Sequence, residues 1–350
     1  MAFASESGYT NLPNGNFSPT IYSKQVQLAF RKAAVANGIT NNDYFGEIAN
    51  QGDTVRIMKE PEITVNSLKR GTAISTQDLQ DADFQLTIDQ ANYFAFKLDD
   101  IEEAHSHVDF MKLATDRAGY KLADQMDTDV LAYLSGYNTD GTVRTTIPGT
   151  KADATAGADE LLAGNKLDIT DFGQITTVAD AGDSIPVAPR LPGATSFSTS
   201  TVSPLQVIAR MGRLLDQRNV DTRGRWLVVD PVFVEMLKDE DSRLLNADFG
   251  GAGLQNGLVI NNLHGFRVYV SNNTVQVGGG SATSGTAAQA TDYGVLVAGH
   301  DSAVASAEQI NKVESYRDPD SFADIVRGMH LYGRKILRPE ALVNARYNAA

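Results

Sequence analysis

The 350-residue chain contains no cysteine, which excludes disulfide bridges, cysteine-ligated zinc or iron–sulfur sites and a cysteine nucleophile. No apolar run approaches the length that crosses a bilayer. The first residues also lack the basic and apolar stretches of a signal peptide. We therefore expect the chain to fold in a reducing compartment and to contact no membrane.

Basic residues are scarce as well, with 30 Lys and Arg against 43 Asp and Glu, a formal net charge of −13. Nucleic-acid binders usually carry a basic surface, because their affinity comes largely from the release of phosphate counterions. The chain as a whole should therefore repel DNA, a property that suits the wall of a DNA container but does not identify one. The 42% hydrophobic and 21% charged residues are typical of a folded protein with one large domain or two ordinary ones.

The order of the segments carries most of the information. An irregular N-terminal arm comes first, with a short helix predicted over residues 22–36 that Asn37 and Gly38 end. A strand at 54–59 and a return strand over 83–98 then enclose a long polar excursion with Lys69 and Arg70 at its tip. A two-stranded excursion of this length is marginally stable alone in water, so we expect it to lie on another surface.

A single apolar stripe then predicts one long helix over residues 99–137, with Asp100 and Glu103 as a capping box. At about 1.5 Å per residue this helix spans roughly 50 Å, more than the width of a small domain. A hairpin that cannot cover itself, next to a helix too long for one small core, indicates that other copies of the chain complete the structure. This favours a shell-building subunit over an enzyme.

The remaining chain reads as a loop-rich insertion followed by a strand-rich segment. Residues 138–202 are rich in Gly, Ala, Thr and Asp, and 278–289 form a flexible loop. Ser203 and Pro204 are typical of a helix start. The predicted helices cover 204–218 and 231–238, and the predicted strands 225–229, 258–260, 266–270, 293–298, 310–316 and 324–337.

Candidate catalytic or metal-binding residues are few, and none forms a constellation. His105 and His107 would point to nearly opposite sides of the helix, while His105 and Asp109 share a face without a third ligand. The glycine-rich stretch at 250–253 lacks the Lys-Ser/Thr ending of a phosphate-binding loop. We therefore predict no catalytic, cofactor-binding or metal site.

A local concentration of arginine stands out in this acidic chain. Arg side chains there could meet phosphate or pair with carboxylates across an interface, and the interface is favoured. The residues are Arg210, Arg213, Arg218, Arg223 and Arg225.

Several segments, taken in order, resemble the major capsid proteins of tailed bacteriophages, which have the HK97-type fold, and among these the P22 coat protein group. The segments are NFSPTIYS at 16–23, DYFGEIANQGDTVRI at 43–57, LTIDQANYFAFKLDD at 86–100, RWLVVDP at 225–231, GHDSA at 299–303 and RKILRPE at 334–340.

The resemblance implies an α+β fold with a fixed domain order. It implies an N-terminal arm at 1–46, an extended E-loop hairpin at 47–98, a P-domain spine helix at 99–137, an axial A-domain at 138–310 with variable loops at 138–202 and 278–290, and P-domain strands at 311–350.

The resemblance also implies the function and the partners. Pentamers and hexamers of the chain would form an icosahedral shell around double-stranded DNA, which the inner face contacts weakly. Assembly would take place in the host cytoplasm, with a scaffolding protein, a portal and a possible decoration protein. The rival interpretations are an encapsulin-type nanocompartment and, more remotely, an enzyme of unknown type.

One contact follows from the residues themselves. Lys69 and Arg70 are predicted to dock on carboxylates of a neighbouring subunit's long helix, where nine acidic residues stand against three basic ones. The nine are Asp99, Asp100, Glu102, Glu103, Asp109, Asp116, Asp124, Asp127 and Asp129. Arg210, Arg213 and Arg218 are the other candidates for contacts between subunits.

Overall fold

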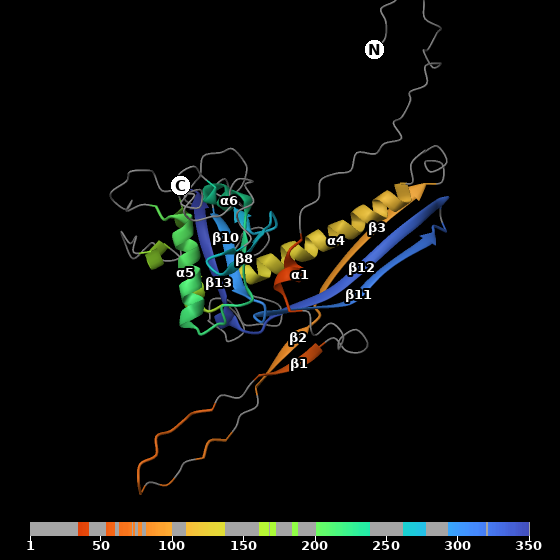
Figure 1. Ribbon diagram of the computed structural model, residues 1–350. Helices are drawn as coiled ribbons and strands as arrows, with labels where there is room; N and C mark the ends of the chain where they lie inside the picture. The colour runs from red at the N-terminus through yellow and green to blue at the C-terminus, as the bar shows by residue number, and fades with distance from the viewer. Residues whose placement is uncertain are drawn as a thin grey trace, which may run out of the picture.

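A computed structural model shows a mixed α and β fold (Figure 1), in agreement with the α+β prediction. The structure describes residues 34–41, 54–59, 63–71, 73, 76–78, 82–99, 110–136, 161–167, 169–172, 184–187, 201–238, 262–277, 293–319 and 321–349. Two sheets and a projecting hairpin are arranged around one long helix.

The larger sheet has eight strands, in the order β4-β13-β10-β6-β8-β7, with β5 on β13 and β9 on β10. Their bounds are Lys166–Leu167 (β4), Ile185–Val187 (β5), Arg225–Val229 (β6), Asn262–Leu263 (β7), Phe266–Val270 (β8), Gln276–Val277 (β9), Tyr293–His300 (β10) and Leu342–Ala349 (β13). In β6, Leu227 and Val229 face helices α5 (Pro204–Gln217) and α6 (Pro231–Leu237). Because strand side chains alternate, Trp226 and Val228 face the opposite core.

That opposite core is formed by the end of the long helix α4 (Phe110–Ser135) and by the short helix α1 (Ala36–Ile39). The rest of α4 runs along the second sheet, whose three antiparallel strands are β11 (Val304–Arg317), β12 (Ala323–Ile336) and β3 (Gln90–Asp99), with β12 in the middle (Figure 1). One helix therefore packs on both sheets.

The hairpin of β1 (Thr54–Lys59) and β2 (Ala82–Thr87) projects from the base of the molecule (Figure 1). Leu86 attaches it to the body, because this side chain is fully buried beside Ala305 and Ala307 of β11. Three short 3₁₀ helices complete the described elements: η1 (Ala163–Asn165), η2 (Ile169–Phe172) and η6 (Pro339–Ala341).

Two predictions about the first hundred residues are wrong. The return strand does not continue over 83–98, because it ends at Thr87 and β3 then pairs with β12 instead of β1. Asp99 lies at the end of β3, so the long helix does not begin there, and the described helix starts at Phe110. The predicted capping box at Asp100 and Glu103 lies outside the described residues.

The predicted helix stop is also wrong, because Asn37 and Gly38 lie inside α1. Residues 34–41, which lie within the N-terminal arm expected at 1–46, pack on the body, since Ile39 is fully buried against α4. Most of the predicted helix at 22–36 lies outside the described residues.

The boundaries expected in the second half of the chain need correction as well. The division at residue 310 falls inside β11, and β13, expected with the P-domain strands, lies in the eight-stranded sheet beside β10. Parts of the expected loop 138–202 also belong to this sheet, since β4 and β5 both pair in parallel with β13. The strand predicted at 225–229 is confirmed, and the strand predicted at 258–260 lies outside the described residues.

Substitution of two glycines by alanine should change the stability of the subunit in opposite directions. A Cβ at Gly328 in β12 would lie 2.3 Å from Cε1 of Phe94, so Gly328→Ala should lower the free energy of unfolding by about 1–3 kcal/mol. A Cβ at Gly119, on the exposed side of α4, would meet no atom within 4 Å. Gly119→Ala should therefore raise the free energy of unfolding by about 0.5–1 kcal/mol through helix propensity. Urea unfolding of unassembled subunits measures both changes, and a destabilised Gly119→Ala subunit would contradict the prediction.

Candidate assembly surfaces

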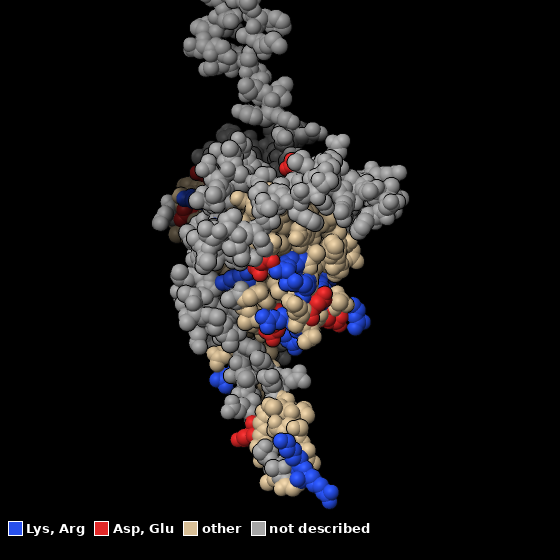
Figure 2. All heavy atoms as spheres, turned by 90° about the vertical axis from the view of Figure 1, so that its left-hand side faces the viewer, with Lys and Arg blue, Asp and Glu red and all other residues tan. Residues whose placement is uncertain are grey.

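The excursion beyond β1 and β2 reaches far from the body, and Lys and Arg side chains lie at its end (Figures 1 and 2). Lys69 and Arg70 are exposed there, next to a turn in which Gly71 has a φ of +89°. Apolar side chains along the same segment are also exposed, among them Ile63 at 69%, Val65 at 92% and Leu68 at 74%. This combination of apolar and basic exposed groups is typical of a contact surface.

The acidic residues of α4 are less available than the sequence suggests. Asp129 lies 2.7 Å from Nη1 of Arg334 and accepts a hydrogen bond of 3.0 Å from its Nη2, while the Arg334 side chain is only 5% exposed. Tyr332 donates to the same carboxylate at 3.0 Å, and burial and Asp129 raise the pKa of its hydroxyl. The Arg334 guanidinium also lies 4.9 Å from the centre of the Tyr133 ring. This cluster fixes α4 on β12.

Asp124 and Asp127 are also engaged within the subunit. Asp127 is 1% exposed and accepts from Val35, Ala36 and Asn273, and Asn273 also donates to Asp124. Of the nine acidic residues of the predicted set, Asp124, Asp127 and Asp129 therefore bond within the subunit, and the contact of Lys69 and Arg70 with carboxylates of a neighbouring subunit stays a prediction. Among the described residues of that set, Asp99 and Asp116 are the exposed ones.

The arginine cluster divides into inward and outward members. Nη2 of Arg210 donates to the Asp171 carbonyl, and Arg225, with 5% of its side chain exposed, lies 2.8 Å from Asp216 and donates to two backbone carbonyls. These two arginines stabilise the subunit itself. Arg213 and Arg218 on the α5 side are exposed.

Figure 2 looks onto this side, where Lys and Arg side chains lie beside Asp and Glu side chains. Arg223 is 92% exposed and lies 3.5 Å from Asp221. The face is therefore of mixed charge, which suits contact with a protein surface.

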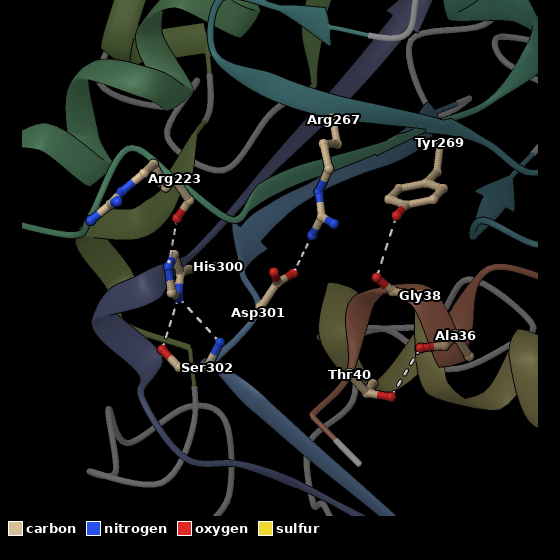
Figure 3. A network of polar contacts seen from close by, with 9 residues as sticks. All are labelled: Ala36, Gly38, Thr40, Arg223, Arg267, Tyr269, His300, Asp301 and Ser302. Carbon is tan, nitrogen blue, oxygen red and sulfur yellow. Dashed lines mark hydrogen bonds and ion pairs between the residues drawn. The ribbon is translucent and has the colours of Figure 1, made fainter. Parts of the chain in front are cut away.

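A polar network ties the end of β10 to neighbouring turns (Figure 3). Nδ1 of His300 lies 2.8 Å from the Ser302 hydroxyl and accepts from the Ser302 amide, while Nε2 lies 2.9 Å from the Arg223 carbonyl. Asp301 pairs with Arg267 at 2.5 Å and not with His300. The network contains Ser, His and Asp but does not have the geometry of a catalytic triad, because the carboxylate does not orient the imidazole. Its hydrogen bonds stabilise the turns that they connect. Gly224, with a φ of +80°, leaves room for the His300 ring.

The other sequence candidates give no site in the described residues. His105, His107, Asp109 and the stretch 250–253 lie outside them. No group of three or more potential metal ligands and no membrane-spanning helix occurs in the part of the chain that the structure describes.

The carboxylate of Asp230, which caps the start of α6 directly after β6, is buried. Its oxygens accept hydrogen bonds from the Phe233 amide at 3.2 Å, from the Tyr347 hydroxyl and from Gln276 at 3.4 Å. Burial raises the pKa of Asp230 from 3.8 to about 6, against the opposing effect of the hydrogen bonds from Tyr347 and Phe233. Burial also raises the pKa of Tyr347, so its hydroxyl stays a donor.

The two sheets on one long helix, the projecting hairpin and the exposed apolar and charged surfaces suit a structural subunit that packs against further copies. The sequence matches the phage capsid protein family over residues 83–345, and the chain belongs to that family. No protein of curated function matches the sequence.

Solved capsid structures share the fold. A structure from Mycobacterium phage Che8 has 25% identity and a TM-score of 0.64, with 95% of this chain and 97% of that chain covered. The capsid of cyanophage P-SCSP1u has 17% identity and a TM-score of 0.65, with 96% and 94% covered. The capsid of a native GTA particle has 14% identity and a TM-score of 0.58, with 96% and 97% covered.

These matches confirm the prediction of a tailed-phage major capsid protein with an HK97-type fold. The protein is therefore a component of the virion. The capsid family and its structures do not favour the encapsulin alternative. The narrower likeness to the P22 coat protein group stays a prediction.

The Asp230 carboxylate predicts a pH dependence of stability. Its folded-state pKa of about 6 lies above the usual 3.8, so the folded chain holds this proton more tightly than the unfolded chain does. The contribution of Asp230 to the free energy of unfolding is therefore fully present below about pH 4. It falls by about 3 kcal/mol as the pH rises to about 6 and above. Asp230→Asn should remove this fall in urea unfolding measured from pH 4 to 8. Asp221→Asn, at an exposed carboxylate, is the control, and equal pH slopes in Asp230→Asn and the parent would refute the assignment.

Proposed function

We propose that the chain assembles through pentamers and hexamers into an icosahedral shell that encloses double-stranded DNA. The observation that carries this proposal is the projecting hairpin, whose exposed Ile63, Val65 and Leu68 have no cover within the described subunit. In a closed shell the neighbouring subunit supplies that cover. The negative net charge of −13 makes the binding of DNA to the shell weak, because the chain as a whole repels phosphate groups.

We further propose a division of the subunit that follows the sheets. The hairpin of β1 and β2 is the E-loop, the three-stranded sheet with α4 is the P-domain, and the eight-stranded sheet, β13 included, is the A-domain. A scaffolding protein, a portal and a possible decoration protein are the expected partners, and assembly is expected in the host cytoplasm.

Electron microscopy of the expressed protein, alone and with the scaffolding protein, tests this function. Closed shells, or rings of five and six subunits, are the expected result. A monomer or dimer under every condition would overturn the proposal.

Lys69 and Arg70 are proposed to contact Asp116 or Asp99 of a neighbouring subunit, since these are the exposed described carboxylates of the predicted set. One exposed pair contributes only about 0–1 kcal/mol, but it recurs at every copy in a shell. Reversing both charges (Lys69→Glu with Arg70→Glu) should lower the shell yield and the temperature at which shells dissociate. Light scattering during heating measures both effects.

The control for this experiment is Lys238→Glu, which reverses an exposed charge at the end of α6. A compensating Asp116→Lys should restore part of the loss if Asp116 is the partner, and Asp99→Lys should do so if Asp99 is. Shells of unchanged yield and heat resistance in the double variant would reject the contact. Arg213→Glu and Arg218→Glu test the α5 side in the same assay, with Arg210 left intact because it bonds within the subunit.

A further inference from the structure

Residues 34–41 are built into the body of the subunit at the place where its two sheets meet. The Asn41 amide donates to Val304 at 2.8 Å, the Ser306 amide donates to Asn41 at 3.1 Å, and the Thr40 and Ser306 hydroxyls lie 2.8 Å apart. Figure 3 shows the same segment beside Tyr269 of β8, whose hydroxyl donates to Gly38 at 3.4 Å. The segment therefore contacts strands of both sheets.

The strongest contact of this segment is with Asp127 of α4. One carboxylate oxygen, Oδ1, accepts from both the Val35 and the Ala36 amides at 2.7 Å. The other, Oδ2, accepts from Nδ2 of Asn273 at 2.8 Å. Hydrogen bonds to a charged acceptor are stronger than neutral ones, and a buried carboxylate that loses its donors is costly.

The position of Asp127 makes this contact an anchor point. Asp127 is 1% exposed, and it joins α4 to residues 34–36 on one side and to the loop after β8 on the other. Two positions further along α4, Asp129 faces the three-stranded sheet through Arg334. Residues two apart on a helix point to different sides, so one turn of α4 holds both neighbours.

We propose that Asp127 is the positioning residue that anchors the N-terminal arm to the body, and that residues 34–41 form a fixed segment between the arm and the β1–β2 hairpin. Displacement of residues 34–36 from α4 is then opposed by the loss of both amide hydrogen bonds to this buried carboxylate. The proposal goes beyond the shell function and is testable on the unassembled subunit.

Amide hydrogen exchange of the unassembled full-length subunit tests the anchor. Asp127→Ala should accelerate exchange at Val35 and Ala36 by about 10- to 100-fold, because both amides lose a charged acceptor. Exchange in β6 and β10, and in β1 and β2, should stay within about twofold of the parent. Protease cleavage near residue 34 should speed up in parallel.

Two further variants separate an anchor from a general packing role. Asp127→Asn keeps an acceptor oxygen for the two amides, so its acceleration should be smaller and should occur at the same two positions. This variant also decides the question if Asp127→Ala does not fold. Asp116→Ala removes an exposed carboxylate of the same helix and should leave these amides unchanged. A uniform acceleration throughout the subunit, a change in β1 and β2, or no change at Val35 and Ala36 would overturn the proposal.

Discussion

The ion pair between Asp129 of α4 and the buried Arg334 of β12 holds the long helix on the three-stranded sheet. Burying the Arg334 charge is costly unless it remains paired, and removal of one partner from a fully buried pair typically costs about 3–5 kcal/mol. Here the Tyr332 hydroxyl and the Tyr133 ring complete the surroundings of the pair. Because the end of α4 also covers one face of the eight-stranded sheet, this pair and the turn from β10 to β11 both connect the two sheets.

The subunit uses its charges in two ways that differ in burial. Asp127 and Arg225 are buried, Asp129 is partly buried, and all three bond within the chain, where they fix helices and turns. Lys69, Arg70 and Asp116 are exposed at the surface of the subunit. An exposed pair is weak by itself, so a shell that relies on many such pairs can assemble without a strong trap at any single contact.

Local sequence signals predicted the elements whose own residues carry the pattern. The apolar run of β6 and the Pro204 start of α5 lie at their predicted positions, and α4 ends within two residues of its predicted end. The failures involve partners distant in the sequence. Residues 93–98 alternate as a strand should, but alternation does not tell whether β1 or β12 is the neighbour. The short strands β4 and β5 have almost no pattern and exist because β13 offers them an edge.

The sequence by itself determined the family, the order of the main elements and the exposed basic tip at Lys69 and Arg70. Tertiary structure alone decided which carboxylates of α4 are buried. Asp116 and Asp127 both lie on the same acidic, amphipathic helix, and the pattern along the chain gave no reason to treat them differently. Their roles separate because residues 34–36 and Asn273, more than ninety positions from Asp127 in sequence, meet one of them and not the other. Burial of a charge depends on what packs over it, and packing is a property of the whole fold.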